Sequence, residues 1–115
     1  MKNLVVIAPL IFLALGFKAC EKVVFPPSGD VYETFSASVQ PIFNSDCISC
    51  HDGGRDPNLT EGNSYNALKN GGFIDTANPE SSVLYEKLTS THASRTSENN
   101  KKIILDWIKD GAPNN

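Results

Sequence analysis

The sequence lacks three features that would place it in common protein classes. Its longest apolar run, residues 4–17, is about 14 residues, shorter than a membrane-spanning helix needs. No stretch shows the apolar–polar alternation of a half-buried strand. Basic residues do not dominate, because ten Lys and Arg face thirteen Asp and Glu. This balance argues against nucleic acid and against anionic membrane surfaces as partners.

The first 19 residues have the pattern of an export signal. A short positive start, residues 1–3, leads into the apolar run, which has the length of a signal peptide. The run ends at Ala19-Cys20, and a small residue directly before a cysteine resembles a bacterial lipobox. We therefore expect Cys20 to become the lipidated first residue of the mature protein. The alternative is ordinary cleavage nearby, which would leave Cys20 as an odd free thiol.

Both alternatives imply export. With lipid on Cys20, we expect a membrane-anchored lipoprotein that faces the periplasm or the cell surface. Loss of residues 1–19 removes two basic residues and no acidic one, which leaves a net charge near −5. Residues 20–29 contain Pro26, Pro27 and Gly29 and predict a short tether. Residues 30–115 are long enough for one domain.

The most informative stretch is Cys47-Ile48-Ser49-Cys50-His51, a C-x-x-C-H motif typical of c-type haem attachment. Two thiols three residues apart lie on one side of a helical turn and can add to the two vinyl groups of one porphyrin. His51 would then bind the iron as its proximal ligand. A chance match in so short a chain has a probability of roughly one in a thousand.

Three alternatives remain for this motif. Cys47 and Cys50 could form a redox or structural disulfide. They could bind zinc together with His51 and His92, although adjacent Cys50 and His51 would both have to reach one tetrahedral ion. They could also be buried thiols without a ligand.

Apolar spacings of three and four predict an all-α fold of four to five short helices. The first helix is expected over residues 30–43, and Pro41 should end or bend it. Residues 44–46 are good N-cap types for a separate short helix that carries the cysteines. The expected apolar face of the first helix is Tyr32, Phe35, Val39 and Phe43.

Three further helices follow a polar loop at residues 52–57. One begins at Asn63 or Ser64 and stops at Gly71-Gly72, and the next opens at Asn78-Pro79-Glu80. The last begins after Ser97 and ends before Gly111. Their inner faces are expected to include Leu68, Val83, Leu84, Leu88, Ile104, Trp107 and Ile108.

These residues resemble the small single-haem cytochrome c domains of bacteria. The matching blocks are Val39-Gln40-Pro41-Ile42-Phe43 ahead of the motif, Leu59-Thr60 with Ser64-Tyr65-x-x-Leu68 and Gly71-Gly72, Pro79-Glu80-Ser81-Ser82-x-Leu84-Tyr85-x-Lys87-Leu88, and Ile104-x-x-Trp107-Ile108-x-x-Gly111-Ala112. The resemblance implies a cytochrome c-like fold in which the first and last helices cross. It also implies one haem c, bound covalently through Cys47 and Cys50, with His51 as the proximal ligand.

The chain departs from that family at the sixth iron ligand. The family usually supplies a methionine there, but the single methionine of this chain is Met1. His92, the only other histidine, stands in the corresponding stretch and is the candidate distal ligand. Replacing Met by imidazole should lower the reduction potential. Alternatively His92 is a solvated loop residue; Lys87 is a poorer candidate because its charge favours solvent.

The resulting hypothesis is an electron-transfer protein rather than an enzyme. It would exchange electrons with redox partner proteins of the cell envelope and would have no dedicated small-molecule substrate. Arg55 could pair with a haem propionate or lie in solvent. One competing hypothesis is a haem-based module that binds or senses a small ligand at an open distal site. The other is a lipid-anchored protein without haem.

Overall fold

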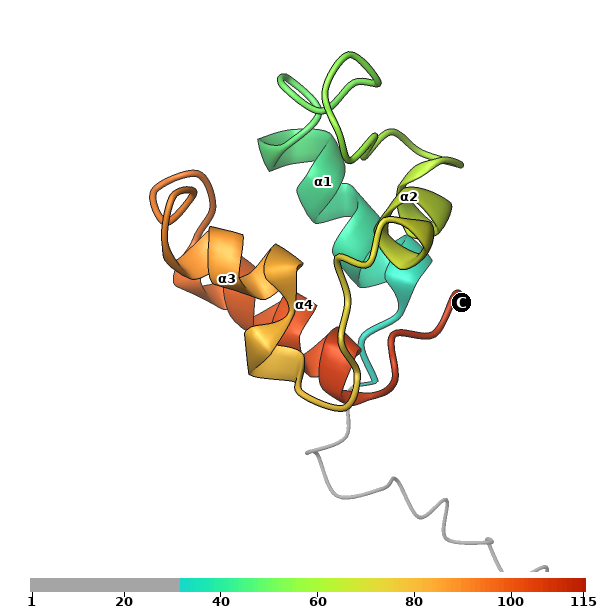
Figure 1. Cartoon of the computed structure of the whole chain (residues 1–115), viewed down its shortest axis with the longest axis vertical. Coiled ribbons are helices and arrows are strands. Elements are labelled where there is room, and N and C mark those ends of the chain that lie inside the picture. The colour runs from blue at the N-terminus through green and yellow to red at the C-terminus, as the bar shows by residue number, and fades with distance from the viewer. Residues whose placement is uncertain (1–31) are drawn as a thin grey trace, which may run out of the picture.

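The computed structural model describes residues 32–115, and every regular element in this range is helical (Figure 1). The elements are the π-helix η1 (Phe35–Val39), α1 (Gln40–Asp46), α2 (Ser64–Asn70), the 3₁₀ helix η2 (Pro79–Ser81), α3 (Val83–Thr89) and α4 (Glu98–Lys109). The all-α prediction is confirmed for these residues. None of their helices combines the length and apolarity needed to cross a membrane. The expected signal peptide at residues 1–19, Cys20, the whole tether at residues 20–29 and the first two residues of the expected domain lie outside the described residues.

The first helical segment continues through Pro41, so the expectation that it could end there is wrong; it changes from a π-helix to an α-helix directly before the proline. The N–H of Gln40 donates to the carbonyl of Phe35, five residues back, which makes a wide π turn. Pro41 falls in the first turn of α1, where a missing N–H and the bulk of the ring are tolerated. The segment therefore runs without interruption from η1 to the end of α1 at Asp46.

The haem-type motif does not begin a helix of its own, which corrects a second expectation. Residues 44–46 form the last turn of α1 instead of an N-cap. The N–H of Cys47 donates to Phe43 O at 3.0 Å, and the N–H of His51 donates to Cys47 O at 3.0 Å. The chain thus adds one more helical turn across the motif, and this turn is an extension of α1.

The middle helices match the predicted positions with one correction. α2 begins after Asn63 and ends at Gly71, as expected. The helix expected from Asn78 onward is divided, because Ser82 has the extended ψ of 132° between η2 and α3. The Ser82 hydroxyl holds this break, accepting from Asp75 N at 2.9 Å and donating to Asp75 O at 3.2 Å. Local preferences on either side of Ser82 gave no sign of that contact.

The last helix is capped as predicted, and it packs against the first. Ser97 Oγ accepts from a backbone N–H of the first turn of α4 at 3.1 Å. The ring centres of Phe35 and Trp107 lie 5.2 Å apart, which joins η1 to α4. α3 also packs against α4. The fully buried Trp107 therefore lies where the first and last helices meet.

The core contains almost every apolar residue assigned to it from the sequence. Tyr32 and Val83 are the exceptions. Tyr32 precedes η1 and is 72% exposed, and Val83 is 39% exposed, so the assignment of both to inner faces was wrong. The buried cluster is Phe35, Val39, Ile42, Phe43, Leu59, Leu68, Leu84, Leu88, Ile104, Trp107, Ile108 and Ala112.

Candidate functional site

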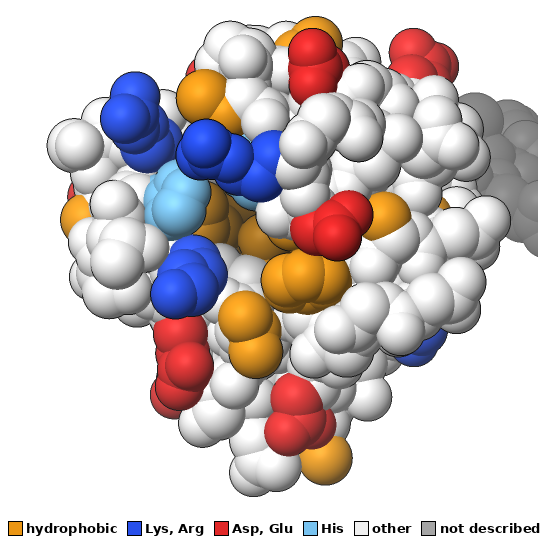
Figure 2. All heavy atoms as spheres, turned by 45° about the horizontal axis from the view of Figure 1, so that its top comes forward, with side chains coloured by type: hydrophobic (Ala, Val, Ile, Leu, Met, Phe, Trp, Pro, Cys, Tyr) orange, Lys and Arg blue, Asp and Glu red, His pale blue; other side chains and the backbone are white. Residues whose placement is uncertain are grey.

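A cavity of about 310 Å³ opens between the turn that carries the cysteines and α3 with the loop that follows it. Figure 2 shows it as a hollow with a hydrophobic floor. Its apolar wall belongs to the core, and polar and sulfur-bearing side chains complete it. The apolar lining residues include Phe43, Leu59, Phe73, Leu84 and Leu88, and the others include Cys47, Cys50, His51, Lys87, His92 and Arg95.

His51 is held in one ring orientation and one tautomer. Its Nδ1 lies 3.0 Å from the carbonyl oxygen of Pro57, and a carbonyl can only accept, so Nδ1 carries the proton. The backbone carbonyl of His51 also accepts from Leu59 N at 2.9 Å, which fixes the loop around it. Nε2 is therefore left with a free lone pair. A backbone carbonyl that orients a ligating histidine in this way is common around protein-bound metals.

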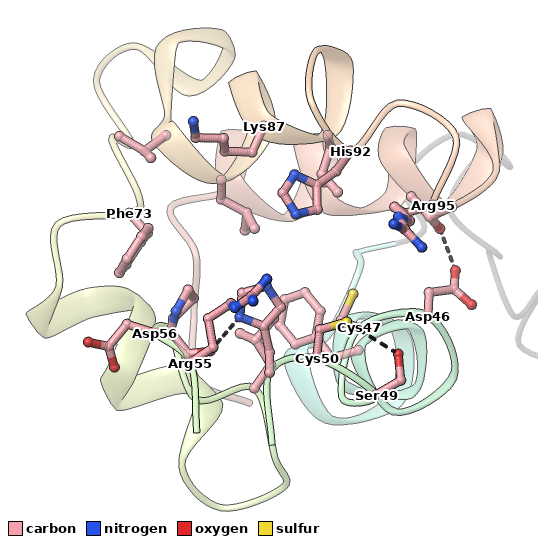
Figure 3. Close-up of a pocket in the computed structure, with 18 residues that line it drawn as sticks. Asp46, Cys47, Ser49, Cys50, Arg55, Asp56, Phe73, Lys87, His92 and Arg95 are labelled. Atoms are coloured by element: carbon pink, nitrogen blue, oxygen red, sulfur yellow. Dashed lines mark hydrogen bonds between the residues drawn. The ribbon is translucent and has the colours of Figure 1, made fainter. Parts of the chain in front are cut away.

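His92 approaches the cavity from the opposite side. It comes from the loop after α3 and points across the cavity toward the side on which Cys47 and Cys50 lie (Figure 3). Its Nδ1 is 2.9 Å from Thr91 Oγ1, which leaves Nε2 without a partner among these contacts. The ring centres of His51 and His92 lie 6.3 Å apart, with 44° between the ring planes.

This separation matches the ring-centre distance expected for two imidazoles on opposite sides of one metal ion. A metal–nitrogen bond of about 2.0 Å, with about 1.1 Å more from nitrogen to ring centre on each side, gives a centre-to-centre distance of about 6.2 Å. The observed 6.3 Å agrees with it. Rotation about the metal–nitrogen bonds leaves this distance unchanged, so the 44° between the planes is compatible with the same arrangement.

The two thiols lie at the edge of the cavity in different environments. Cys47 is half-buried and Cys50 is exposed, and no disulfide joins them in the structure. Burial, and to a smaller extent the charge of Asp46, raises the pKa of the Cys47 thiol to about 11. Ser49 Oγ lies 4.0 Å from Cys50 Sγ, a long contact that does not restrict that thiol.

The cavity lining carries three basic side chains, Arg55, Lys87 and Arg95, and two acidic ones, Asp46 and Asp56. None of the three basic side chains forms an ion pair among residues 32–115. Basic side chains and a histidine gather around the hollow in Figure 2. Sequence reasoning had considered Arg55 and Lys87 and had missed Arg95. The only feature of the sequence that could have placed Arg95 at the cavity is its position three residues after His92.

The residues predicted from the sequence are thus brought together around one cavity. The two imidazoles, the two thiols, the apolar wall and the three basic side chains suit a flat, largely apolar and partly anionic group that carries a metal ion. The zinc alternative lacks a ligand set, because no three His, Cys, Asp or Glu side chains converge on one point within the described range. No protein family, curated protein or solved structure matches this chain.

Proposed function

We propose that this protein is a single-haem c-type cytochrome that transfers electrons at the cell envelope. In this proposal Cys47 and Cys50 hold haem c covalently, His51 is the proximal iron ligand and His92 is the distal one. The observation that carries the proposal is the 6.3 Å separation of the two imidazole rings across the cavity. The C-x-x-C-H motif beside it explains why the group would be covalently attached.

The ligand count favours a macrocycle over a bare ion. His51 and His92 can supply two opposed nitrogens, and the described residues offer no third convergent ligand. A porphyrin would supply the other metal ligands itself, so haem would need no further ligand from the protein. The thiols at the cavity edge would form thioethers with its vinyl groups. Arg55, Lys87 and Arg95 at the rim are suited to its propionates.

Ligation of the haem iron by both His51 and His92 would favour electron transfer over ligand binding or an enzymatic reaction. When bound, haem supplies one-electron chemistry at its iron. The chain holds the two imidazoles that would bind the iron: the Pro57 carbonyl orients His51, and Thr91 Oγ1 contacts the ring of His92. No methionine lies within residues 32–115, so His/Met ligation is excluded and a lower reduction potential is expected.

The proposal extends to the part of the chain before the domain. Residues 1–19 would direct export, and lipid on Cys20 would anchor the protein to the membrane through the tether at 20–29. The haem domain would then face the periplasm or the cell surface. Redox proteins of the same envelope would be its partners, and no small molecule would be converted.

The deciding experiment is visible absorption of the full-length protein, exported in cells that attach c-type haem, with and without carbon monoxide. The wild type should show covalent haem, and its reduced spectrum should not change immediately when carbon monoxide is added, because the gas must first displace an iron ligand. His92→Ala should keep the haem but bind the gas at once, because one axial position is opened. Cys47→Ala with Cys50→Ala should lose covalent haem and leave the domain largely unfolded.

Each alternative hypothesis has its own outcome in this experiment. Immediate gas binding by the wild type would favour the open-site sensing module. Absence of a Soret band from protein made in competent cells would refute a haem protein altogether. A cooperative unfolding transition in the double cysteine variant would show that the fold does not depend on the haem.

A further inference from the structure

We infer that Asp46 is a positioning residue that fixes the distal histidine by clasping the loop of His92 to the cysteine-bearing turn. This inference rests on the proposed haem function. Asp46 is the last residue of α1 and directly precedes Cys47. The sequence had suggested for it only a role in capping a helix that does not form.

The clasp consists of three side chains from three parts of the chain. Asp46 Oδ2 accepts from Thr96 Oγ1 at 2.5 Å and from Asn100 Nδ2 at 3.1 Å. The same Asn100 Nδ2 lies 3.1 Å from Thr96 Oγ1, which closes the triangle. Figure 3 shows Asp46 beside the segment of Arg95, at the end of the cavity where the cysteines lie. The hydrogen bonds, that of Thr96 first, hold the pKa of Asp46 below its ordinary value of 3.8.

The other anchors of the loop all lie on its own side of the cavity. The N–H of His92 donates to Lys87 O in α3 at 2.8 Å. Lys101 of α4, only 4% exposed, donates its Nζ to Ala93 O at 2.7 Å. Among the hydrogen bonds of the described residues, the bond from Thr96 to Asp46 is the one that joins residues 89–96 to residues 32–60.

The proposed role of Asp46 follows from its position on the other side of the cavity from the remaining hydrogen-bond partners of the loop. His51 belongs to the side of the cavity formed by α1 and its extension, and His92 belongs to the side formed by α3 and α4. The distance between the two imidazoles is therefore a distance between two sides of the cavity, and the clasp joins these sides next to the cysteines. Without it, the loop would keep its contacts to α3 and α4 but would move away from His51 more often.

The test breaks the clasp by substitutions that leave the proposed iron ligands His51 and His92 unchanged. Asp46→Asn keeps the shape of the side chain and removes its charge and one acceptor, and Thr96→Val removes the hydroxyl that donates to Asp46 and accepts from Asn100. Glu80→Gln is the matched control, because it makes the same carboxylate-to-amide change in a surface pair, 3.1 Å from Lys109 Nζ. In the haem-loaded full-length protein, carbon monoxide should bind about tenfold faster to the two clasp variants than to wild type and the control.

A second measurement separates positioning from a general loss of stability. Amide hydrogen exchange should become faster at His92, Ala93 and Arg95 in the clasp variants and stay unchanged in α2. The double variant of Asp46 and Thr96 should bind the gas no faster than the stronger single variant, because both changes remove the same bond between the loop and the cysteine-bearing turn.

The inference is overturned if both clasp variants bind carbon monoxide as slowly as the control. It is equally overturned if exchange rises to the same degree throughout the domain. A wild-type protein without a Soret band would refute the proposed function instead. Exchange at residues 92–95 in the same variants would then still show whether the clasp holds the loop.

Discussion

Replacing Trp107 by Phe tests whether the first and last helices are joined through one buried ring. Trp107 is fully buried, its ring centre lies 5.2 Å from that of Phe35, and its Nε1 donates to Pro113 O at 2.9 Å. Phenylalanine keeps an aromatic ring but loses this donor and part of the volume. The lost hydrogen bond is worth about 1 kcal/mol and the smaller ring about 1–2 kcal/mol more.

We therefore expect Trp107→Phe to lower the free energy of unfolding by about 2–3 kcal/mol, against about 4–13 kcal/mol for a domain of this size. Urea unfolding of the haem-loaded protein, followed by far-ultraviolet circular dichroism, measures the change. Fluorescence is unsuitable because Trp107 is the only tryptophan of the chain. Tyr32→Ala is the control: Tyr32 is 72% exposed, so its loss should change stability by less than about 0.5 kcal/mol.

Two results would show that this reasoning is mistaken. If Trp107→Phe lowered the free energy of unfolding by less than about 0.5 kcal/mol, the indole contacts would not be what holds the two helices together. A loss of the same size in Tyr32→Ala would mean that the exposed residues before η1 contribute as much as the core.

Three further predictions concern single sites. Gly71→Ala should cost about 1–3 kcal/mol in urea unfolding, because its Cβ would lie 2.4 Å from Phe73 Cε2; Gly54→Ala, with a nearest atom at 3.4 Å, should cost less. Ser97→Ala should cost about 1 kcal/mol by the same assay, since it removes the N-cap of α4, and an unchanged midpoint would contradict that role. Because the pKa of Asp46 is lowered in the folded state, its stabilisation is present above about pH 4 and is lost as the pH falls through the folded pKa. Stability measured from pH 7 down to pH 2 should therefore fall less steeply in Asp46→Asn than in the wild type, and identical slopes would contradict this assignment.

The local parts of this protein could be predicted from the sequence. The C-x-x-C-H motif, the spacing of apolar residues and the Ser97 cap each act within a few residues, so they identified the turn with Cys47 and Cys50, the all-α fold and the start of α4. Local rules failed where a distant contact overrode them. Ser82 breaks a helix because its hydroxyl is bound to Asp75.

Pro41 shows a different limit. Its missing N–H was recognised, but the helix before it widens by a π turn and so accommodates the proline without ending. Propensity alone does not distinguish a helix that stops from one that changes its hydrogen-bond register.

The arrangement of the site was decided by the tertiary structure alone. The sequence named His51 and His92, but only the packing of α3 and α4 opposite the end of α1 sets their ring centres 6.3 Å apart. The contact between Asp46 and Thr96 joins residues fifty positions apart, beyond the reach of any local pattern. Sequence thus determined which chemical groups the protein carries, and the long-range packing of the helices determined which of them face one another across the cavity.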